Sequence, residues 1–266
     1  MKLNNGKDIP NIGLGTWMIK NKLAAEAVKE AIKAGYRHID SARVYFNEKG
    51  VGEGIRQCGL KREEVFVTSK VYQGHKTYLK AMKAIDHSLR RMGLDYIDLM
   101  LIHWPKPIFS LHSKKTYFKE NLDVWRAFED AYHAGKLKAI GVSNFSIDDL
   151  ENLIKHTNIK PMVNQIKIHI GHTPMALITY CQQHGIVVEA YSPIARGRAM
   201  QHKEIVDMAK KYHVSVPQLC IRYTLDLGVV TLPKTGNPHH MKDNLDVDFV
   251  ISDDDLKRLK EMTLVI

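Results

Sequence analysis

The 266-residue chain has few cysteines and no long apolar run. Its three cysteines, Cys58, Cys181 and Cys220, are odd in number, widely spaced and without a CxxC pair. A disulfide framework is therefore excluded, and we expect reduced thiols in a cytoplasmic protein. No apolar stretch approaches the ~18 residues of a membrane span, and the first residues lack the apolar core of a secretory signal. We expect no membrane partner.

The chain also lacks linkers, low-complexity tracts, internal repeats and blocks of five like charges. Its net charge of +10 is spread over the polar faces of expected helices, as at Lys29, Lys33, Lys80 and Lys83. A solvated surface explains such lysines, and a phosphate-bearing cofactor is an economical source of part of the surplus. We expect a single domain over residues 1–266, no nucleic-acid partner and a monomer.

Eight short β-prone runs alternate with segments of helical period. The runs begin near Gly13, Arg37, Val65, Ile97, Lys138, Met162, Ile186 and Val229. Residues 97–102 and 186–190 are almost continuously apolar, as strands of a parallel sheet covered on both faces are. Eight strand–helix units over roughly 250 residues predict an α/β fold, the (β/α)8 barrel.

Further elements are expected beside the barrel. Residues 1–12 predict a short N-terminal β-hairpin with its turn at Asn5-Gly6. The interval between the last two strands is long enough for two helices, over 203–212 and 216–227. We expect two helices in addition to the barrel's own. Ser146 and Ser252 each precede an acidic residue by three positions, which predicts a helix N-terminus at each.

Four polar residues, Asp40, Tyr45, Lys70 and His103, lie at or just beyond the carboxyl ends of expected strands. In a barrel these ends meet at one mouth, so residues distant in sequence converge there. The pKa of a free tyrosine is near ~10, and a neighbouring ammonium such as Lys70 lowers it. Asp40 can hold Lys70 in place, and His103 can orient a carbonyl oxygen. Together these groups predict a site that protonates a carbonyl oxygen.

Each of the four also has a purely structural interpretation. Tyr45 could be a half-buried loop aromatic, and His103 could cap a strand. Asp40 and Lys70 could form a structural ion pair. The catalytic interpretation rests on the convergence of all four at one place.

Two other patterns suggest functions that we do not adopt. Gly50-Val-Gly52-Glu-Gly54 resembles a phosphate loop, but it does not directly follow a strand and lacks the full GxGxxG spacing. We expect close helix packing there. The fourteen histidines suggest a metal, but the later strand ends offer Asn144 and Gln165, which are poor ligands. We expect no metal.

Motifs in order along nearly the whole chain resemble those of the aldo-keto reductase family. They are residues 13–17 (GLGTW), 35–40 (GYRHID), 68–70 (TSK), 94–99 (LDYIDL), 101–105 (LIHWP), 139–145 (AIGVSNF), 163–165 (VNQ), 189–193 (EAYSP), 232–234 (LPK) and Asn244. The compact length resembles bacterial members, including the 2,5-diketo-D-gluconate reductases. The resemblance implies a barrel that binds NADPH across the strand ends without a Rossmann motif. It also implies reduction of aldehyde or ketone carbonyls to alcohols.

The resemblance implies roles for individual residues. Tyr45 is the expected general acid, Lys70 with Asp40 tunes it, and His103 orients the carbonyl. Expected substrate contacts are Trp17, Phe46, His103 and Trp104. Expected cofactor contacts are Ser143, Asn144 and Gln165 for the carboxamide, Tyr191 for the nicotinamide ring, Ser192 and Ile194 beside the pyrophosphate, Lys234 and Thr235 for the 2′-phosphate, Asp243 and Asn244 for the adenine, and also Gly15, Thr16, Trp17, Asp40, Asn237 and His240.

The sequence departs from the family pattern at several of these motifs. Tyr72 replaces a tryptophan, Lys167 an acid and Ile170 a proline. His240 replaces the arginine of the 2′-phosphate loop, so we expect a weaker preference for NADPH over NADH. The chain stops at Ile266 without the closing loop of many animal relatives, and we therefore expect a wide pocket that prefers small polar carbonyls over steroids.

The alternative function is a cofactor-binding, redox-sensing or regulatory subunit with vestigial reductase activity. Some relatives keep the fold and the cofactor chiefly to gate a partner. The intact set of Asp40, Tyr45, Lys70 and His103 argues against lost chemistry.

Overall fold

In a computed structural model, which describes residues 1–110 and 113–263, eight parallel strands pair in sequence order. The strands are β1 (Leu14–Gly15), β2 (His38–Asp40), β3 (Phe66–Val71), β4 (Leu99–Ile102), β5 (Ile140–Ser143), β6 (Val163–Lys167), β7 (Val187–Tyr191) and β8 (Val230–Leu232). Parallel bridges from Ile12 to Thr231 and from Gly15 to Lys234 join the two ends of the sheet into a barrel. The predicted (β/α)8 barrel is confirmed, and every strand begins close to its expected position.

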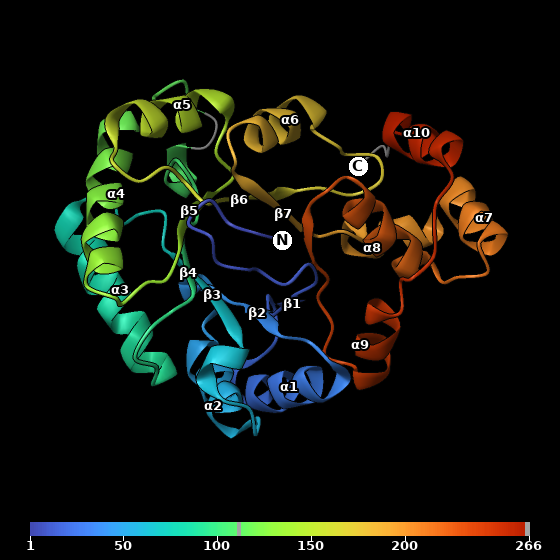
Figure 1. Ribbon diagram of the computed structural model, residues 1–266, viewed down its shortest axis with the longest axis horizontal. Coiled ribbons are helices and arrows are strands. Elements are labelled where there is room, and N and C mark those ends of the chain that lie inside the picture. Colours follow the sequence, from blue (N-terminus) through green and yellow to red (C-terminus); the bar gives the residue numbers. More distant parts are fainter. Residues whose placement is uncertain (111–112, 264–266) are drawn as a thin grey trace.

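Helices surround the barrel on all sides in Figure 1. Those of the described residues are α1 (Asn21–Ala34), α2 (Glu48–Gln57), α3 (Tyr78–Met92), α4 (Phe118–His133), α5 (Ile147–His156), α6 (Met175–Gln183), α7 (Lys203–Lys211), α8 (Val216–Asp226), α9 (Pro238–Leu245) and α10 (Asp253–Glu261). Ser146 and Ser252 cap α5 and α10 as expected. None of the helices in this described part is long and apolar enough to cross a membrane.

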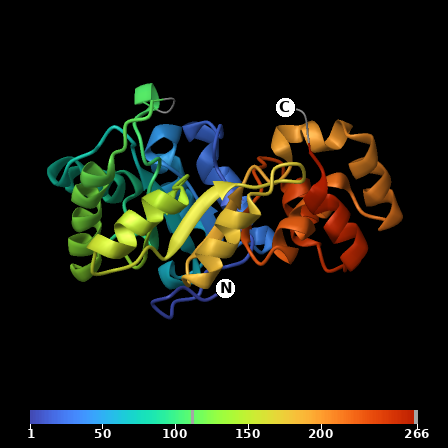
Figure 2. The ribbon, with the colours of Figure 1, turned by 90° about the horizontal axis from the view of Figure 1, so that it is seen from above.

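The two helices beyond the eight of the barrel are α7 and α10. Both lie at the same side of the molecule, beyond α8, in the orange and red part of Figures 1 and 2. Lys211 of α7 donates to the Asp255 carboxylate of α10 at 2.6 Å, which ties them together. The expected helices over 203–212 and 216–227 are therefore α7 and α8, and the second additional helix comes after β8.

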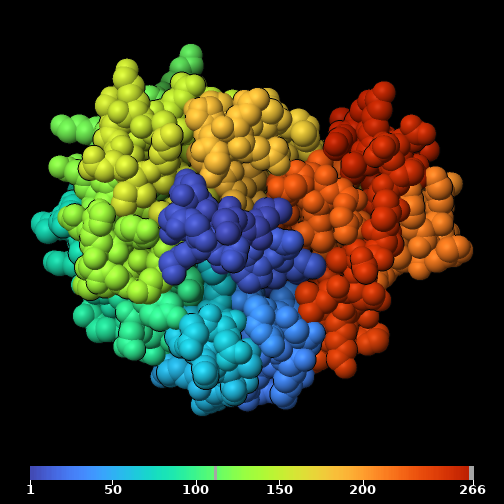
Figure 3. Space-filling model, in the orientation of Figure 1, coloured from blue at the N-terminus to red at the C-terminus, as the bar shows by residue number. Residues whose placement is uncertain are grey.

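The N-terminal segment covers the end of the barrel at which the strands begin. Asn4 and Asn5 donate to the main-chain carbonyls of Pro161 and Lys138, which precede β6 and β5. Figure 3 shows this dark blue segment across the middle of that face. An antiparallel bridge from Lys2 to Asp8 makes it a hairpin.

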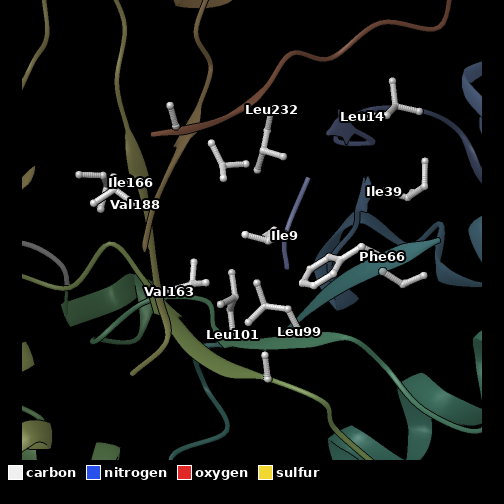
Figure 4. Close-up of a cluster of buried hydrophobic side chains, with 14 of the residues drawn as sticks. Ile9, Leu14, Ile39, Phe66, Leu99, Leu101, Val163, Ile166, Val188 and Leu232 are labelled. Atoms are coloured by element: carbon white, nitrogen blue, oxygen red, sulfur yellow. The ribbon is translucent and has the colours of Figure 1, made fainter. Parts of the chain in front are cut away.

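The hairpin turn differs by one residue from the expected Asn5-Gly6 pair. The amide of Gly6 donates to the carbonyl of Leu3 at 2.9 Å, so Asn4 and Asn5 are the central residues of the turn. Gly6 follows with a φ of 83°, which glycine adopts without strain. Ile9 then enters the barrel end and lies among Leu14, Ile39, Phe66, Leu99, Leu101, Val163, Ile166, Val188 and Leu232 in Figure 4.

The glycines at 50, 52 and 54 lie on α2, where it packs against α1 and α3. A Cβ on Gly50 would lie 2.2 Å from the Asn21 carbonyl oxygen, and one on Gly52 would lie 2.0 Å from that of Met92. A Cβ on Gly54 would lie 2.7 Å from the Ala25 carbonyl oxygen. These glycines let helix backbones approach closely, as expected, and they do not form a phosphate loop.

We expect Gly52→Ala to lower the free energy of unfolding by about 2–3 kcal/mol, because helix α2 must move away from Met92 to admit the methyl group. Better helix propensity of alanine offsets only about 1 kcal/mol of this cost. Urea unfolding measures the change. Gly236→Ala is the control, since a Cβ there meets nothing within 4 Å. Wild-type stability of Gly52→Ala would contradict the packing.

Candidate active site

Asp40, Tyr45, Lys70 and His103 come together at the carboxyl ends of the strands. Asp40 ends β2, Lys70 lies near the end of β3, and His103 directly follows β4. Tyr45 ends a short 3-10 helix, η1 (Arg43–Tyr45), beyond β2. A cavity of about 340 Å³ opens here and is lined by Asp40, Tyr45 and His103, with Lys70 buried beneath it. The expected convergence of the four residues is therefore present.

Lys70 is fixed in place by three hydrogen bonds. Its Nζ donates to the two carboxylate oxygens of Asp40 at 2.6 and 2.7 Å and to the carbonyl oxygen of Ser41 at 2.9 Å. Burial alone would lower the pKa of Lys70, but the Asp40 carboxylate in contact with it raises this pKa above its usual value. Lys70 is therefore an ammonium whose three donors are all used.

Tyr45 lies beside this ammonium, with the Lys70 Nζ 5.1 Å from the centre of its ring. Burial raises the pKa of Tyr45, while the positive charge of Lys70 opposes the rise. Lys70 thus acts in the expected direction, but burial outweighs it. The phenol keeps its proton at neutral pH, and the nearby ammonium favours the phenolate that remains when the proton leaves.

His103 faces Tyr45 edge-on, with 5.9 Å between the ring centres. Burial and the charge of Lys70 lower the pKa of His103 to about 3, so the imidazole is neutral. A neutral imidazole carries one N–H donor, which can bind a carbonyl oxygen. The main chain of His103 is held on both sides. Its N–H donates to the Val71 carbonyl at 3.2 Å, and its carbonyl accepts from Asn144 Nδ2 at 3.1 Å.

Gln165 presents an acceptor to the cavity that it lines. Its Nε2 donates to Asp40 Oδ1 and to Glu189 Oε2, each at 2.9 Å. Since both amide hydrogens are used, the remaining polar atom is Oε1, which accepts hydrogen bonds. Tyr191 donates to Asn144 Oδ1 at 2.8 Å, and Asn144 Nδ2 donates to Ser143 Oγ at 2.9 Å. A connected polar wall therefore lines the cavity, since Ser143 Oγ also donates to the Gln165 carbonyl oxygen at 2.8 Å.

Sequence reasoning missed Glu189, a fully buried carboxyl group inside β7. Burial and the charge of Asp40 raise the pKa of Glu189 to about 8, so it holds a proton at neutral pH. His38 Nε2 lies 3.6 Å from Glu189, but burial lowers the pKa of His38 to about 3 and no ion pair forms. The available signal is a charged residue inside an apolar run.

Among residues 1–110 and 113–263, no group of three or more His, Cys, Asp or Glu could hold a metal ion.

A second cavity, of about 690 Å³, adjoins the first. Both are lined by Trp17, Ser192, Arg196 and Lys234, so they share a border. Several residues expected to contact the cofactor lie only in the second cavity: Ile194, Thr235, His240, Asp243 and Asn244. The first cavity contains Gly15, Trp104, Ser143, Asn144, Gln165 and Tyr191 of the expected set.

Arg196 is a further residue that sequence reasoning missed. Its guanidinium carbon lies 4.8 Å from the centre of the Trp17 ring, at the border of the two cavities. It lies in η4 (Ala195–Gln201), where Ala195 and Arg196 have φ values of 50° and 55°. A basic residue in the turn just after a strand end is the available signal. Gln73, Val44 and Ile108 also line the first cavity without having been expected there.

Three expected contacts lie away from both cavities. Phe46 is 74% exposed, and the guanidinium carbon of Arg43 lies 5.4 Å from the centre of its ring. Phe46 itself has the left-handed backbone conformation that ends η1, which places its ring on the surface. Thr16 is buried, and its hydroxyl donates to the Asp40 carbonyl. Asn237 caps α9 by accepting from the His239 amide. These contacts indicate structural roles for the three residues.

Residues 11–263 match the Aldo/keto reductase family. The chain belongs to this family. It is 44% identical over 261 residues to glyoxal reductase of Bacillus subtilis, and the alignment covers 97% of this chain and 91% of that protein. The similarities do not single out the 2,5-diketo-D-gluconate reductases, so that finer assignment stays a prediction.

Solved structures of aldo-keto reductases share the whole fold. MGS-M4, from a deep-sea metagenome library, superposes with a TM-score of 0.92 at 39% identity, covering 99% of this chain and 94% of that one. The Bombyx mori aldo-keto reductase in complex with NADP superposes with a TM-score of 0.89 at 34% identity, covering 98% and 91%. This aldo/keto reductase is thus an oxidoreductase.

Proposed function

We propose that this aldo/keto reductase reduces aldehyde or ketone carbonyls to alcohols with NADPH, and that Tyr45 supplies the proton. One observation carries the proposal. A protonated phenol, a buried ammonium and a neutral imidazole meet at one cavity. NADPH, when bound, supplies the hydride that adds to the carbonyl carbon. The residues of the chain have to bind the carbonyl oxygen and protonate it.

The proton passes from the Tyr45 hydroxyl to the carbonyl oxygen as negative charge develops there. His103, which is neutral, donates a hydrogen bond to the same oxygen and fixes its position. Lys70 stabilises the phenolate left on Tyr45, and Asp40 keeps Lys70 in place through its two carboxylate contacts. Later uptake of a proton from solvent restores the phenol.

The residues present fit a nicotinamide dinucleotide. The free Oε1 of Gln165 suits the amide group of a carboxamide, and the side-chain amide of Asn144 lies beside it in the same wall. The second cavity extends from Ser192 to Asp243 and Asn244, and we assign the adenosine half to it. Lys234, Thr235 and His240 would face the 2′-phosphate. The Bombyx mori relative crystallised in complex with NADP supports a nicotinamide dinucleotide as the ligand.

The cavity volume favours small substrates. About 340 Å³ is near the lower end of the roughly 300–1,000 Å³ that is typical of ligand pockets. We propose small polar aldehydes and ketones as substrates, in line with the name of the glyoxal reductase relative. No observation favours a redox-sensing or regulatory subunit. We also propose that residues 1–266 act as a single cytoplasmic domain and as a monomer.

The absorbance of NADPH tests this function directly. The protein is mixed with NADPH and a graded series of carbonyls that includes glyoxal, keto-sugars and steroid ketones. We expect cofactor oxidation with the small members and little with the steroids. Oxidation with none of them would refute the proposed reaction, and a strong preference for steroid ketones would refute the assignment of substrate size.

His240→Arg should tighten NADPH binding by about tenfold, if about 1.4 kcal/mol is recovered, and leave NADH binding unchanged. An arginine offers a phosphate paired, permanently charged donors, which a histidine ring does not. Dissociation constants for both cofactors measure these effects.

His239→Arg is the matched control, because His239 is exposed and adjacent but lies outside the cavity. It should leave both dissociation constants unchanged. If His240→Arg changes neither dissociation constant, His240 does not face the phosphate.

A further inference from the structure

A buried lysine outside the catalytic set, Lys76, lies in the loop between β3 and α3. Its Nζ donates to the Trp104 carbonyl oxygen at 2.9 Å and to Asn121 Oδ1 at 2.6 Å. Asn121, buried in the first turn of α4, donates from Nδ2 to the Pro105 carbonyl oxygen at 3.1 Å. Two consecutive main-chain carbonyls after His103 are therefore held by two buried side chains.

Keeping a lysine in this place is costly. Burial lowers the pKa of Lys76 to about 7, although the carboxylates of Asp149 on α5 and Glu120 on α4 oppose the change. Its two hydrogen-bond acceptors are neutral, and no salt bridge of Lys76 occurs within the described residues. The two hydrogen bonds offset only part of the cost of burying a lysine that has no carboxylate in contact.

The two carbonyls that Lys76 and Asn121 hold lie beside the substrate cavity. Trp104 lines the cavity in which we place the substrate, and Ile108 lines it a few residues later. His103 is anchored separately, by Val71 on one side and Asn144 on the other. Loss of the Lys76 and Asn121 contacts would therefore free Trp104 while the catalytic imidazole stays in place.

We propose that Lys76 and Asn121 form a clamp that positions Trp104 as a wall of the substrate site. The clamp determines how tightly the carbonyl substrate is bound, and the chemical step does not depend on it. This proposal rests on the proposed function, because it assigns the cavity beside Trp104 to the substrate. Lys76 and Asn121 touch neither that cavity nor the catalytic groups, so both are positioning residues.

Steady-state kinetics with glyoxal and saturating NADPH test the clamp. Lys76→Met keeps the apolar stem and removes the donors. We expect its KM for glyoxal to rise about tenfold, as for the loss of a well-fitting pocket wall, with kcat within about twofold and an unchanged dissociation constant for NADPH. Lys106→Met is the control. Lys106 also donates to a main-chain carbonyl, that of Ser113, but at an exposed position. It should behave as wild type.

Asn121→Leu is a second variant in case Lys76→Met does not fold. It should raise the same KM, and the double variant should be no worse than the more affected single one, because the two residues act as one unit. A lower melting temperature with an unchanged KM would show a merely structural tie and overturn the proposal. So would a fall in kcat without a change in KM.

Fluorine NMR reads the wall itself and needs no turnover. With 5-fluorotryptophan in place of the three tryptophans, Trp104→Phe assigns the resonance of Trp104. We expect one sharp resonance in wild type and a broadened or doubled one in Lys76→Met. An identical resonance in both proteins would overturn the clamp. If instead the resonance changes but no carbonyl is reduced, Lys76 does position Trp104, and it is the proposed function that fails.

Discussion

Tyr45→Phe should lower kcat for carbonyl reduction by about 100-fold or more, with a change of less than about twofold in the dissociation constant of NADPH. The phenolic proton is needed only as charge develops on the substrate oxygen. Burial raises the pKa of Tyr45, so the wild-type enzyme starts with the proton in place, and phenylalanine fills the same space without it. Steady-state kinetics and cofactor titration measure the two quantities.

Tyr72→Phe is the matched control for this prediction. Tyr72 lies just beyond β3 and packs edge-on against His75 at 5.5 Å, outside the cavity. Its kcat should stay at the wild-type value. If Tyr45→Phe retains wild-type turnover, another group donates the proton and the assignment of Tyr45 is wrong.

Lys70→Met should both unfold more easily and lose turnover. Removing one partner of a buried ion pair leaves the Asp40 carboxylate without its cation and costs about 3–5 kcal/mol. The phenolate of Tyr45 also loses the ammonium that stabilises it, so we expect kcat to fall by about 100-fold or more. Urea unfolding and steady-state kinetics give the two effects.

Two further variants separate the causes. Lys136→Met removes a pair with Asp86 in which both side chains are 38% exposed, and it should cost no more than about 1 kcal/mol. Lys70→Met combined with Asp40→Asn removes the stranded charge, so stability should recover in part while turnover remains low. A Lys70→Met protein as stable as Lys136→Met would contradict the buried pair.

The barrel was predictable because its strands leave a strong pattern in the sequence. A parallel strand covered on both faces requires a short apolar run, and residues 97–102 and 186–190 show it clearly. The hairpin turn was harder to predict. The sequence Asn4-Asn5-Gly6 fits a turn centred on Asn4-Asn5 as well as one centred on Asn5-Gly6. Only the hydrogen bond from Gly6 to Leu3 decides between them.

The candidate site was predictable as far as topology determines it. Strand ends converge in a barrel, which brings Asp40, Lys70 and His103 together whatever the loops do. Phe46 lies on a loop, and a left-handed backbone places its ring on the surface, which strand topology does not determine.

The balance between burial and charge was also beyond the sequence. The neighbouring ammonium of Lys70 could be expected, but the extent to which Tyr45 and Glu189 are desolvated depends on packing from several elements. The same holds for Lys76, whose burial beneath Trp104 follows from the path of two loops. An isolated lysine in a polar loop gives no sign of this in the sequence.

Transfer of deuterium tests the proposed reaction most directly. The protein is incubated with a small aldehyde and NADPH that carries deuterium at both positions of the nicotinamide C4, and the alcohol is analysed by mass spectrometry and NMR. We predict one deuterium on the carbinol carbon for each NADPH oxidised, with the hydroxyl proton drawn from solvent. An alcohol without deuterium, or an aldehyde left unreduced, would contradict hydride transfer at this site.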